Sequence, residues 1–384
     1  MSTNDCCPPV AGRPPQAGRS PASCCSSKRC GPQRAGRAPA SDRSSNGWLV
    51  AAGVVLGAPL LVAGGWLGYS TFVIDHHLPL PPAIEAEQQT LTSDIAGTLN
   101  VYADRAPTTA FGVFEGAGRP LLLIHSVNAA ASAYEMRPIF DHYRGQRPVY
   151  ALDLPGYGFS DRTDAARTPE AYAAAIVDVI DKVIGEPADV IALSLGCEFA
   201  ARAALQRPDL FHSIAFISPT GFNASGTGRA TQQAVEQDKT ESAYQMLANP
   251  LWGRALFDLI ATRRSIEFFL KQSFVGPVPP ALIDYAYATA HQPGAQYTPL
   301  RFISGQLFTR EARSVLYESL TLPVLVIYDR DAFSNFDALP DFVAARSTAH
   351  ANWQTARIEP TRGLPHFETM PRVADALDDF WRGL

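Results

Sequence analysis

The stretch Val190-Ile191-Ala192-Leu193-Ser194-Leu195-Gly196 decides the fold of this chain. A short apolar run bounded by a turn is typical of a buried parallel strand, and the residues after Gly196 have a helical pattern as far as Arg207. The small residues Ala192 and Gly196 stand two positions before and two after Ser194, which lets the backbone turn sharply between strand and helix. Such a turn holds the serine hydroxyl exposed at the edge of a sheet. We therefore expect Ser194 to be a nucleophile.

Strand-like and helical segments alternate along most of the remaining chain. Apolar runs like the one before Ser194 recur at residues 121–124, 149–152, 214–217 and 324–327, and a final strand is expected near 354–359. A helix is predicted from the N-cap Thr168 to Gly185. Alternation of this kind predicts an α/β fold with a mostly parallel sheet and helices on both faces. Residues 222–318 interrupt it with helical stretches around 230–246, 251–269 and 280–290, which we interpret as an inserted helical lid.

Charge and cysteine are distributed unevenly over the 384 residues. Residues 1–46 contain seven basic and two acidic residues and are rich in Pro, Gly and Ser, so a disordered basic tail is expected. The net charge of -5 leaves about -10 for the rest of the chain, which gives no electrostatic footprint for nucleic acid. Five of the six cysteines lie in this tail, in a spacing that matches no zinc site, and the body has only Cys197. We expect no metal site and no internal disulfide.

Residues 48–74 contain no charged side chain over 27 positions, and about 20 apolar residues suffice to cross a bilayer as a helix. The stretch is longer than the apolar part of a signal peptide, and it is followed by a proline-containing linker at 75–92 and the domain at 93–384. We expect a single-pass transmembrane anchor. Arg34, Arg37 and Arg43 precede it and the next basic residue is Arg105, so the positive-inside rule puts the N-terminus in the cytoplasm and the domain outside it, in the periplasm of a bacterium.

Two further loops, each directly after a predicted strand, resemble the Ser194 turn in their position in the fold. His125-Ser126-Val127-Asn128 follows the strand at 121–124, and a loop from Asp153 to Asp161 with Gly156 and Gly158 follows the strand at 149–152. From residue 99 to its end the chain resembles the lid-bearing serine hydrolases of the α/β-hydrolase superfamily. The resemblance implies an oxyanion hole made by the backbone N–H groups of Leu195 and Val127, with the Ser126 hydroxyl as a third donor. His125 is then expected to organise its loop.

In this superfamily the nucleophile is followed by an acid and then by a histidine. Of the histidines after Ser194, His366 lies in a loop, residues 363–368, that resembles the catalytic histidine loop, whereas His291 falls in the lid and His350 precedes the last strand. The acid is expected after the strand at 324–327. Asp331 is the preferred candidate, and Asp329 and Asp337 remain alternatives.

The resemblance implies hydrolysis of a small-molecule carboxylic ester through an acyl-enzyme, without cofactor or metal. The aromatic residues of the lid predict an apolar pocket. A carbon–carbon bond hydrolase and a cofactor-free haloperoxidase remain alternatives with the same nucleophile. A membrane-anchored binding protein without turnover is the alternative from another class. Cys197 is expected to pack as a small apolar residue, while the role of Glu198 and the oligomeric state stay open.

Overall fold

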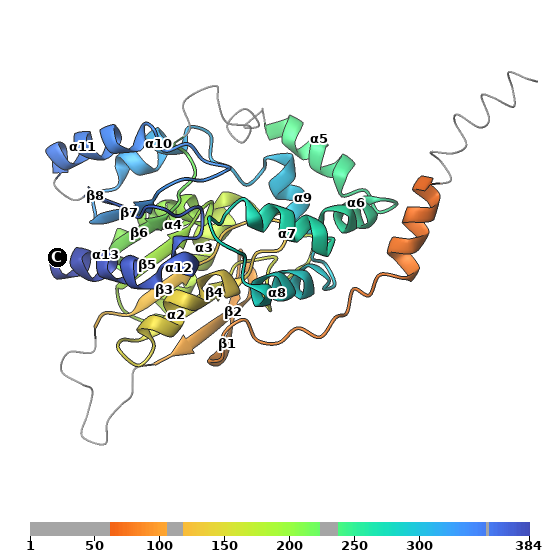
Figure 1. Cartoon of the computed structure of the whole chain (residues 1–384), viewed down its shortest axis with the longest axis horizontal. Coiled ribbons are helices and arrows are strands. Elements are labelled where there is room, and N and C mark those ends of the chain that lie inside the picture. Colours follow the sequence, from red (N-terminus) through yellow and green to blue (C-terminus); the bar gives the residue numbers. More distant parts are fainter. Residues whose placement is uncertain (1–61, 106–117, 223–236, 351–352) are drawn as a thin grey trace, which may run out of the picture. The chain divides into compact units, whose positions relative to one another are not determined.

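The computed structural model of this chain describes residues 62–105, 118–222, 237–350 and 353–384 (Figure 1). The expected tail, residues 1–46, and most of the expected membrane segment, residues 48–74, lie outside this part. Residues 58–384 form one compact unit, and the fold described below belongs to it.

A single eight-stranded sheet runs through the described residues, with the order β1-β2-β4-β3-β5-β6-β7-β8. Strands β3 to β8 correspond to the six predicted runs, the last of which ends at Arg357 and not at Glu359. In the part of the sheet ordered β4-β3-β5-β6-β7-β8 all neighbours pair in parallel, which confirms the α/β prediction. The strands are β1 (Glu87–Ser93), β2 (Gly97–Asp104), β3 (Leu121–Ile124), β4 (Val149–Asp153), β5 (Ala188–Leu193), β6 (Phe211–Ile217), β7 (Val324–Tyr328) and β8 (Trp353–Arg357).

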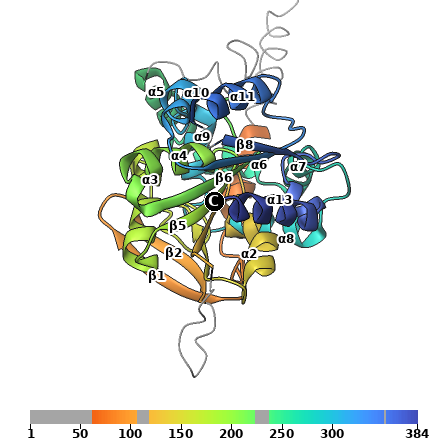
Figure 2. The same ribbon diagram turned by 90° about the vertical axis from the view of Figure 1, so that its left-hand side faces the viewer.

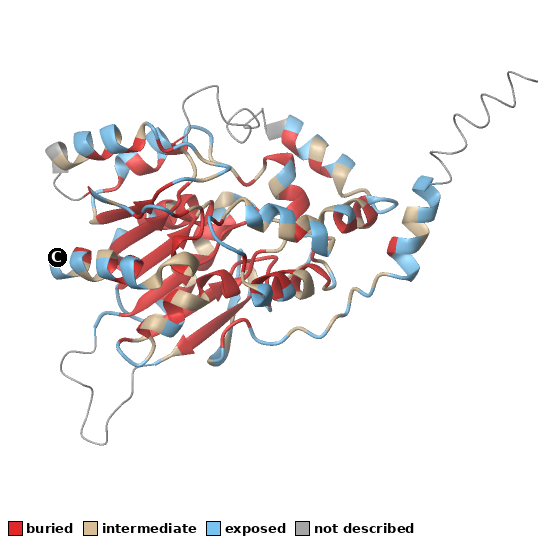
Figure 3. Cartoon of the chain, viewed as in Figure 1, coloured by how far each residue is buried: buried red, intermediate tan, exposed pale blue. Residues whose placement is uncertain are grey.

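Helices cover both faces of the sheet (Figure 2). Neighbouring residues of a strand point to opposite faces, so Leu122 and Ile124 belong to one apolar core and Leu121 and Leu123 to the other. The first core includes side chains of α3 (Pro169–Val179), α4 (Gly196–Gln206) and α11 (Leu339–His350), and the second those of α2 (Arg137–Tyr143) and α13 (Met370–Arg382). The central strands are therefore buried on both sides (Figure 3).

The hairpin of β1 and β2 is the part of the sheet that the sequence patterns did not indicate. β1 pairs antiparallel with β2, and β2 pairs antiparallel with β4. β1 begins at Glu87, so the spacer expected over 75–92 gives way to strand before its end. Gly97 allows the tight connection between the two strands because its φ of 81° is unfavourable for other residues.

The helix predicted between Thr168 and Gly185 forms at these limits. The Thr168 side chain caps α3 by accepting a hydrogen bond from the Ala171 N–H. The last turn, Ile180–Ile184, is a π-helix, and Gly185 ends it with a φ of 79°.

Between β6 and β7 lies a set of helices that matches the position of the expected lid (Figure 1). The helix expected over 251–269 is wrong in one respect, since it forms two helices separated at Thr262. The Thr262 hydroxyl accepts a hydrogen bond from the Ser265 N–H and so starts a new helix. The lid helices are α5 (Gln237–Leu247), α6 (Gly253–Ile260), α7 (Arg263–Lys271), α8 (Pro280–Ala290), α9 (Tyr297–Ser304) and α10 (Ala312–Val315).

Residues 62–72 form a helix that precedes the domain and is drawn in orange in Figure 1. Within the described ranges, none of the helices has both the length and the apolar character needed to cross a bilayer.

Candidate active site

Ser194 lies at the turn between β5 and α4, at the carboxyl edge of the sheet. Its φ of 53° is a left-handed conformation that costs a non-glycine residue on the order of 1 kcal/mol, and its N–H is held by the Ile217 carbonyl at 2.9 Å. A Cβ atom on Gly196 would lie 2.6 Å from the His125 carbonyl oxygen, so only glycine fits there. The Ser194 side chain is half-buried, and its hydroxyl has no hydrogen-bond partner among the described residues.

The loop that follows β3 lies directly beside this turn, because β3 and β5 are paired with Ile124 opposite Ala192. Within the described chain, no backbone or side-chain acceptor takes the N–H of Val127 or of Leu195. The Ser126 N–H donates to Glu135 Oε2 at 3.0 Å, and the Ser126 hydroxyl accepts from Asn128 Nδ2 at 2.9 Å. Two backbone donors therefore remain uncommitted next to the serine, as an oxyanion hole requires.

His125 links the loops after β3 and β4. Its Nε2 accepts a hydrogen bond from the Leu154 N–H at 2.9 Å, so Nδ1 carries the proton and donates to the Ser126 carbonyl at 2.6 Å. Burial lowers the pKa of His125 below its ordinary value and keeps the ring neutral. Both nitrogens are thus occupied by backbone groups, which agrees with the organising role expected for this residue.

His366 lies in the short helix α12 (Pro365–Glu368) and is buried. Its Nε2 is 2.7 Å from the carbonyl oxygen of Glu135, which can only accept, so Nε2 carries the proton. Nδ1 is buried without a hydrogen-bond partner in the described chain. Burial lowers the pKa of His366 to about 4, so the ring is neutral at physiological pH. In this arrangement the ring makes no hydrogen bond to Ser194 or to Asp331.

Glu368 fixes the His366 loop against the lid. One carboxylate oxygen accepts the N–H groups of Val275 and Gly276 at 2.7 and 3.1 Å, and the other accepts the Arg362 N–H at 2.8 Å. Three backbone donors from two segments therefore converge on one side chain. The sequence patterns did not single out Glu368, although its position two residues after His366 was a usable signal.

The two aspartates after β7 have different surroundings. Asp331 Oδ1 accepts the N–H groups of Phe333 and Ser334 at 2.6 and 3.2 Å, while Oδ2 faces Gly363 of the histidine loop, where a Cβ would lie 2.8 Å from it. Burial raises the pKa of Asp331 above its ordinary value. Asp329 is instead occupied by the Arg357 Nε at 3.1 Å and the Thr361 N–H at 3.0 Å.

The third candidate acid, Asp337, is exposed and forms local hydrogen bonds only. Its Oδ2 accepts from Asn335 Nδ2 at 3.0 Å. Asp331 is therefore the candidate whose carboxylate adjoins the loop of His366, although no hydrogen bond joins the two side chains.

Comparison with known proteins identifies the fold. Residues 121–376 match the family described as the alpha/beta hydrolase family, which is more than half of the chain. The chain belongs to the alpha/beta hydrolase family.

Relatives with curated names match only part of this hydrolase. It is 30% identical over 135 residues to the pimeloyl-[acyl-carrier protein] methyl ester esterase of Aliivibrio salmonicida, a match covering 35% of this chain and 49% of the esterase. Against three other curated relatives it spans 28%, 40% and 63% of their length.

Solved structures resemble the hydrolase over much more of its length. A probable hydrolytic enzyme from Pseudomonas aeruginosa PAO1 has a TM-score of 0.59 at 15% identity, covering 78% of this chain and 95% of that chain. A thermophilic esterase from Thermogutta terrifontis has a TM-score of 0.55 at 17% identity, covering 78% of this chain and 99% of that chain. At these identities the similarity concerns the fold alone.

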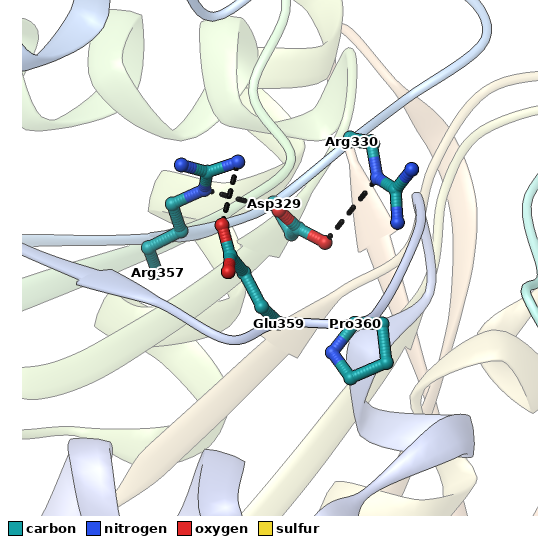
Figure 4. Close-up of a pocket in the computed structure, with 5 residues that line it drawn as sticks. All are labelled: Asp329, Arg330, Arg357, Glu359 and Pro360. Carbon is teal, nitrogen blue, oxygen red and sulfur yellow. Dashed lines mark hydrogen bonds and ion pairs between the residues drawn. The ribbon is translucent and has the colours of Figure 1, made fainter.

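An open pocket of about 500 Å³ lies where β7 and β8 end (Figure 4). Neither Ser194 nor His366 lines it. The residues that line it are Asp329, Arg330, Arg357, Glu359 and Pro360. Arg357 pairs with Asp329 and with Glu359, so the charges of this pocket are largely neutralised by one another. We infer that the residues of this pocket hold Asp329 in place and do not bind substrate.

Glu198 in α4 connects the serine turn to the lid. The buried carboxylate accepts the Thr220 hydroxyl at 2.5 Å and the Thr309 N–H at 2.8 Å, and burial raises its pKa. Cys197 is also buried, and its thiol donates to the Ala192 carbonyl at 3.2 Å. Cys197 is thus buried as expected. Glu198 joins α4 to neighbouring loops through buried hydrogen bonds and is not part of an exposed helix surface.

Proposed function

We propose that this hydrolase cleaves carboxylic esters of apolar acyl groups with Ser194 as the nucleophile. The observation that carries the proposal is the left-handed Ser194 at the carboxyl edge of the sheet, beside the uncommitted N–H groups of Leu195 and Val127. Strain of this kind persists where function requires a fixed side-chain direction. The two donors suit the negative charge that develops on a carbonyl oxygen under attack, where each donor contributes about 3 kcal/mol.

The reaction would proceed through an acyl-enzyme. Ser194 Oγ forms a bond to the carbonyl carbon while its proton passes to His366, and that proton leaves with the alcohol when the ester bond breaks. Water then attacks the acyl carbon while His366 takes one of its protons, and that proton passes to Ser194 Oγ as the bond to the acyl group breaks and the carboxylic acid leaves. The Ser126 hydroxyl would add a donor for the oxyanion, and Asp331 would orient His366.

This mechanism requires the histidine loop to rearrange. With Nε2 on the Glu135 carbonyl, His366 is not placed to take the Ser194 proton, and catalytic hydrogen bonds are often incomplete until substrate is bound. Asp331 Oδ2 already adjoins Gly363, so a shift of the loop, together with transfer of the ring proton from Nε2 to Nδ1, would let Nδ1–H donate to the carboxylate.

A fluorophosphonate probe tests the nucleophile, because it reacts with an activated serine and not with ordinary surface serines. We expect covalent labelling that disappears in Ser194→Ala. The matched control is Ser218→Ala, since Ser218 also has a positive φ of 46° but is buried at the end of the next strand. Labelling that persists in Ser194→Ala would refute the assignment. Acyl esters of graded chain length then define the substrate.

The bond from His366 to Glu135 favours a second candidate, a binding protein that keeps the fold without turnover. A folded chain that neither reacts with the probe nor hydrolyses any ester of the series would establish it. Labelling at Ser194 together with ester turnover would exclude it.

We also propose that residues 48–74 anchor the enzyme in a membrane with the N-terminus in the cytoplasm. The support is the uncharged stretch of 27 residues and the basic residues before it. Protease added outside intact spheroplasts should then degrade the catalytic domain. A domain that stays protected until the cells are lysed would reverse this orientation.

A further inference from the structure

In the helix of residues 62–72, a polar residue is buried and apolar residues are exposed, which is the reverse of a helix that borders water. Its buried residue is Ser70, which is 1% exposed, whereas Val62 and Phe72 are 73% and 86% exposed. A helix on the surface of a soluble domain buries its apolar side and exposes its polar side. The reversed arrangement fits a helix whose outer surroundings are apolar.

The polar side of this helix is bound to lid helix α6. Trp66 Nε1 donates to the Ala255 carbonyl at 2.8 Å, and the Ser70 hydroxyl donates to Asp258 Oδ2 at 2.6 Å. His76, just beyond the helix, lies 3.0 Å from the same carboxylate oxygen. These bonds join about one turn of this helix to about one turn of α6.

Helix α6 also directs its charged residues inward. Asp258 is 1% exposed, and Arg254 bonds to Gln296 and Gln292 of the lid. Its outward side chain Leu259 is 52% exposed, and Leu251, in the turn before the helix, is 77% exposed. The exposed side chains of the two helices are therefore uncharged. With the exposed apolar residues beside them they give the surface that we define by Val62, Phe72, Val73, Leu251, Trp252 and Leu259.

We propose that this surface docks the lid onto the lipid bilayer, with Asp258 holding α6 against the end of the anchor. The proposal rests on the anchor proposed above. A helix from residue 48 to Phe72, where the helix ends, would be about 38 Å long, whereas the hydrocarbon core is about 30 Å thick. The surplus corresponds to the last turns of the stretch, where Ser70 meets Asp258. Trp66 and Tyr69, stacked with ring centroids 5.8 Å apart, lie where aromatic residues concentrate at a membrane interface.

The consequence is that an edge of the lid lies at the lipid headgroups. Esters dissolved in the bilayer would then reach the lid without passing through bulk water. We infer that membrane-resident acyl esters are the substrate class that this placement serves.

The test measures contact with lipid at single positions of the full-length chain in vesicles of phosphatidylcholine with brominated acyl chains. The tail cysteines are replaced by serine, and a cysteine at Leu251 or Leu259 carries an environment-sensitive fluorophore. Ile95→Cys is the matched control, because Ile95 is a 69% exposed apolar residue at the β1–β2 turn. We expect a blue shift and bromine quenching at positions 251 and 259, and neither at position 95.

Two variants of the anchor helix test the clamp. Ser70→Ala removes the bond to Asp258 and should reduce quenching at position 259. Thr71→Ala should leave it unchanged, because the Thr71 hydroxyl donates to the Leu67 carbonyl of its own helix. Equal behaviour of the two variants would show that Asp258 does not hold the lid.

The outcomes separate this inference from the proposals on which it depends. Labels at 251 and 259 that remain as water-exposed as the label at 95, in a chain that resists carbonate extraction, would overturn lipid docking. A blue shift without quenching by brominated lipid would indicate a second copy of the chain on this surface and would also overturn it. Release by carbonate would refute the anchor itself. All measurements are repeated in Ser194→Ala, so they do not depend on hydrolysis.

Discussion

His366 donates its Nε2 hydrogen to the backbone carbonyl of Glu135, a residue 231 positions earlier, across 2.7 Å. This bond assigns the ring's lone pair to Nδ1, which is buried without a partner in the described chain. A buried, unsatisfied nitrogen costs free energy of about 1 to 3 kcal/mol. The cost would be relieved if the histidine loop shifted so that Nδ1 accepted a hydrogen bond, or if the ring proton moved to Nδ1 and Nδ1–H donated to Asp331. The resting position is therefore one that substrate binding can change.

The buried ring makes stability depend on pH in a defined direction. The folded state keeps His366 neutral down to a pKa of about 4, whereas the unfolded chain takes up the proton below about 6.5. Stability is thus lost as the pH falls through this window, by roughly 3 kcal/mol from this residue. We expect His366→Gln to lose less stability than the wild type between pH 6.5 and 4. Urea unfolding at several pH values measures the difference, and parallel curves would contradict the assigned burial.

Asp331 and Asp329 should respond differently to neutralisation. Asp331→Asn should lower kcat roughly 10⁴-fold, as loss of an orienting carboxylate does in serine hydrolases. Asp329→Asn should mainly lower stability, by about 1 to 3 kcal/mol, because Arg357 and the Thr361 N–H lose a charged acceptor. Kinetics and urea unfolding of both variants, with Asp337→Asn as the exposed control, decide between them. If Asp329→Asn abolishes turnover and Asp331→Asn does not, the acid has been assigned to the wrong residue.

The raised pKa of Asp331 adds a second expectation. The folded-state pKa lies above the unfolded one, so this carboxyl costs stability as the pH rises through the interval between them. Asp331→Asn keeps an oxygen for the Phe333 and Ser334 N–H groups and removes this cost. We therefore expect the inactive variant to be at least as stable as the wild type at neutral pH, and a clear loss of stability would contradict the sign of the shift.

The strands of the central sheet could be predicted because burial on both faces leaves a continuous apolar run. Strand β5 is an example, with all six residues buried. β1 gave no such signal, since it lies at the edge of the sheet and four of its seven residues are exposed, namely Glu87, Gln88, Thr90 and Thr92. The break in the lid at Thr262 was likewise missed, because a hydroxyl that caps a helix looks like any polar residue within a helical pattern.

The candidate site divides in a similar way. The position of Ser194 follows from local sequence, since the turn needs only a strand, small neighbours and a helix. The orientation of His366 does not, because its partner is a backbone carbonyl of a distant segment. The hydrogen bonds that the Asp329 carboxylate accepts come from Arg357 and Thr361, and these residues lie beside it only because β7 and β8 pair in the folded chain.

Glu368 should act as a positioning residue for the histidine loop. Its carboxylate gathers the N–H groups of Val275, Gly276 and Arg362, so Glu368→Ala would free the loop from the lid. We expect kcat to fall with little change in KM, and Glu368→Gln to recover part of the loss because it keeps one acceptor oxygen. Steady-state kinetics with a soluble ester measures both. Equal kcat values for Glu368→Ala and the wild type would remove the role.

Gly196→Ala tests the oxyanion hole without touching a functional side chain. The added methyl would lie 2.6 Å from the His125 carbonyl oxygen, a backbone atom that can move only if the loop moves with it. That loop carries the Val127 N–H, so the donor would be displaced from the oxyanion. We expect kcat to fall by about 10²- to 10³-fold, the usual effect of losing one donor. Gly118→Ala is the control, because the nearest atom to a Cβ there is Arg147 Cβ at 3.4 Å, an ordinary contact. Kinetics of both variants, with thermal unfolding to confirm that each is folded, measures the effect. A folded Gly196→Ala enzyme with wild-type kcat would mean that the loop after β3 does not take part in catalysis.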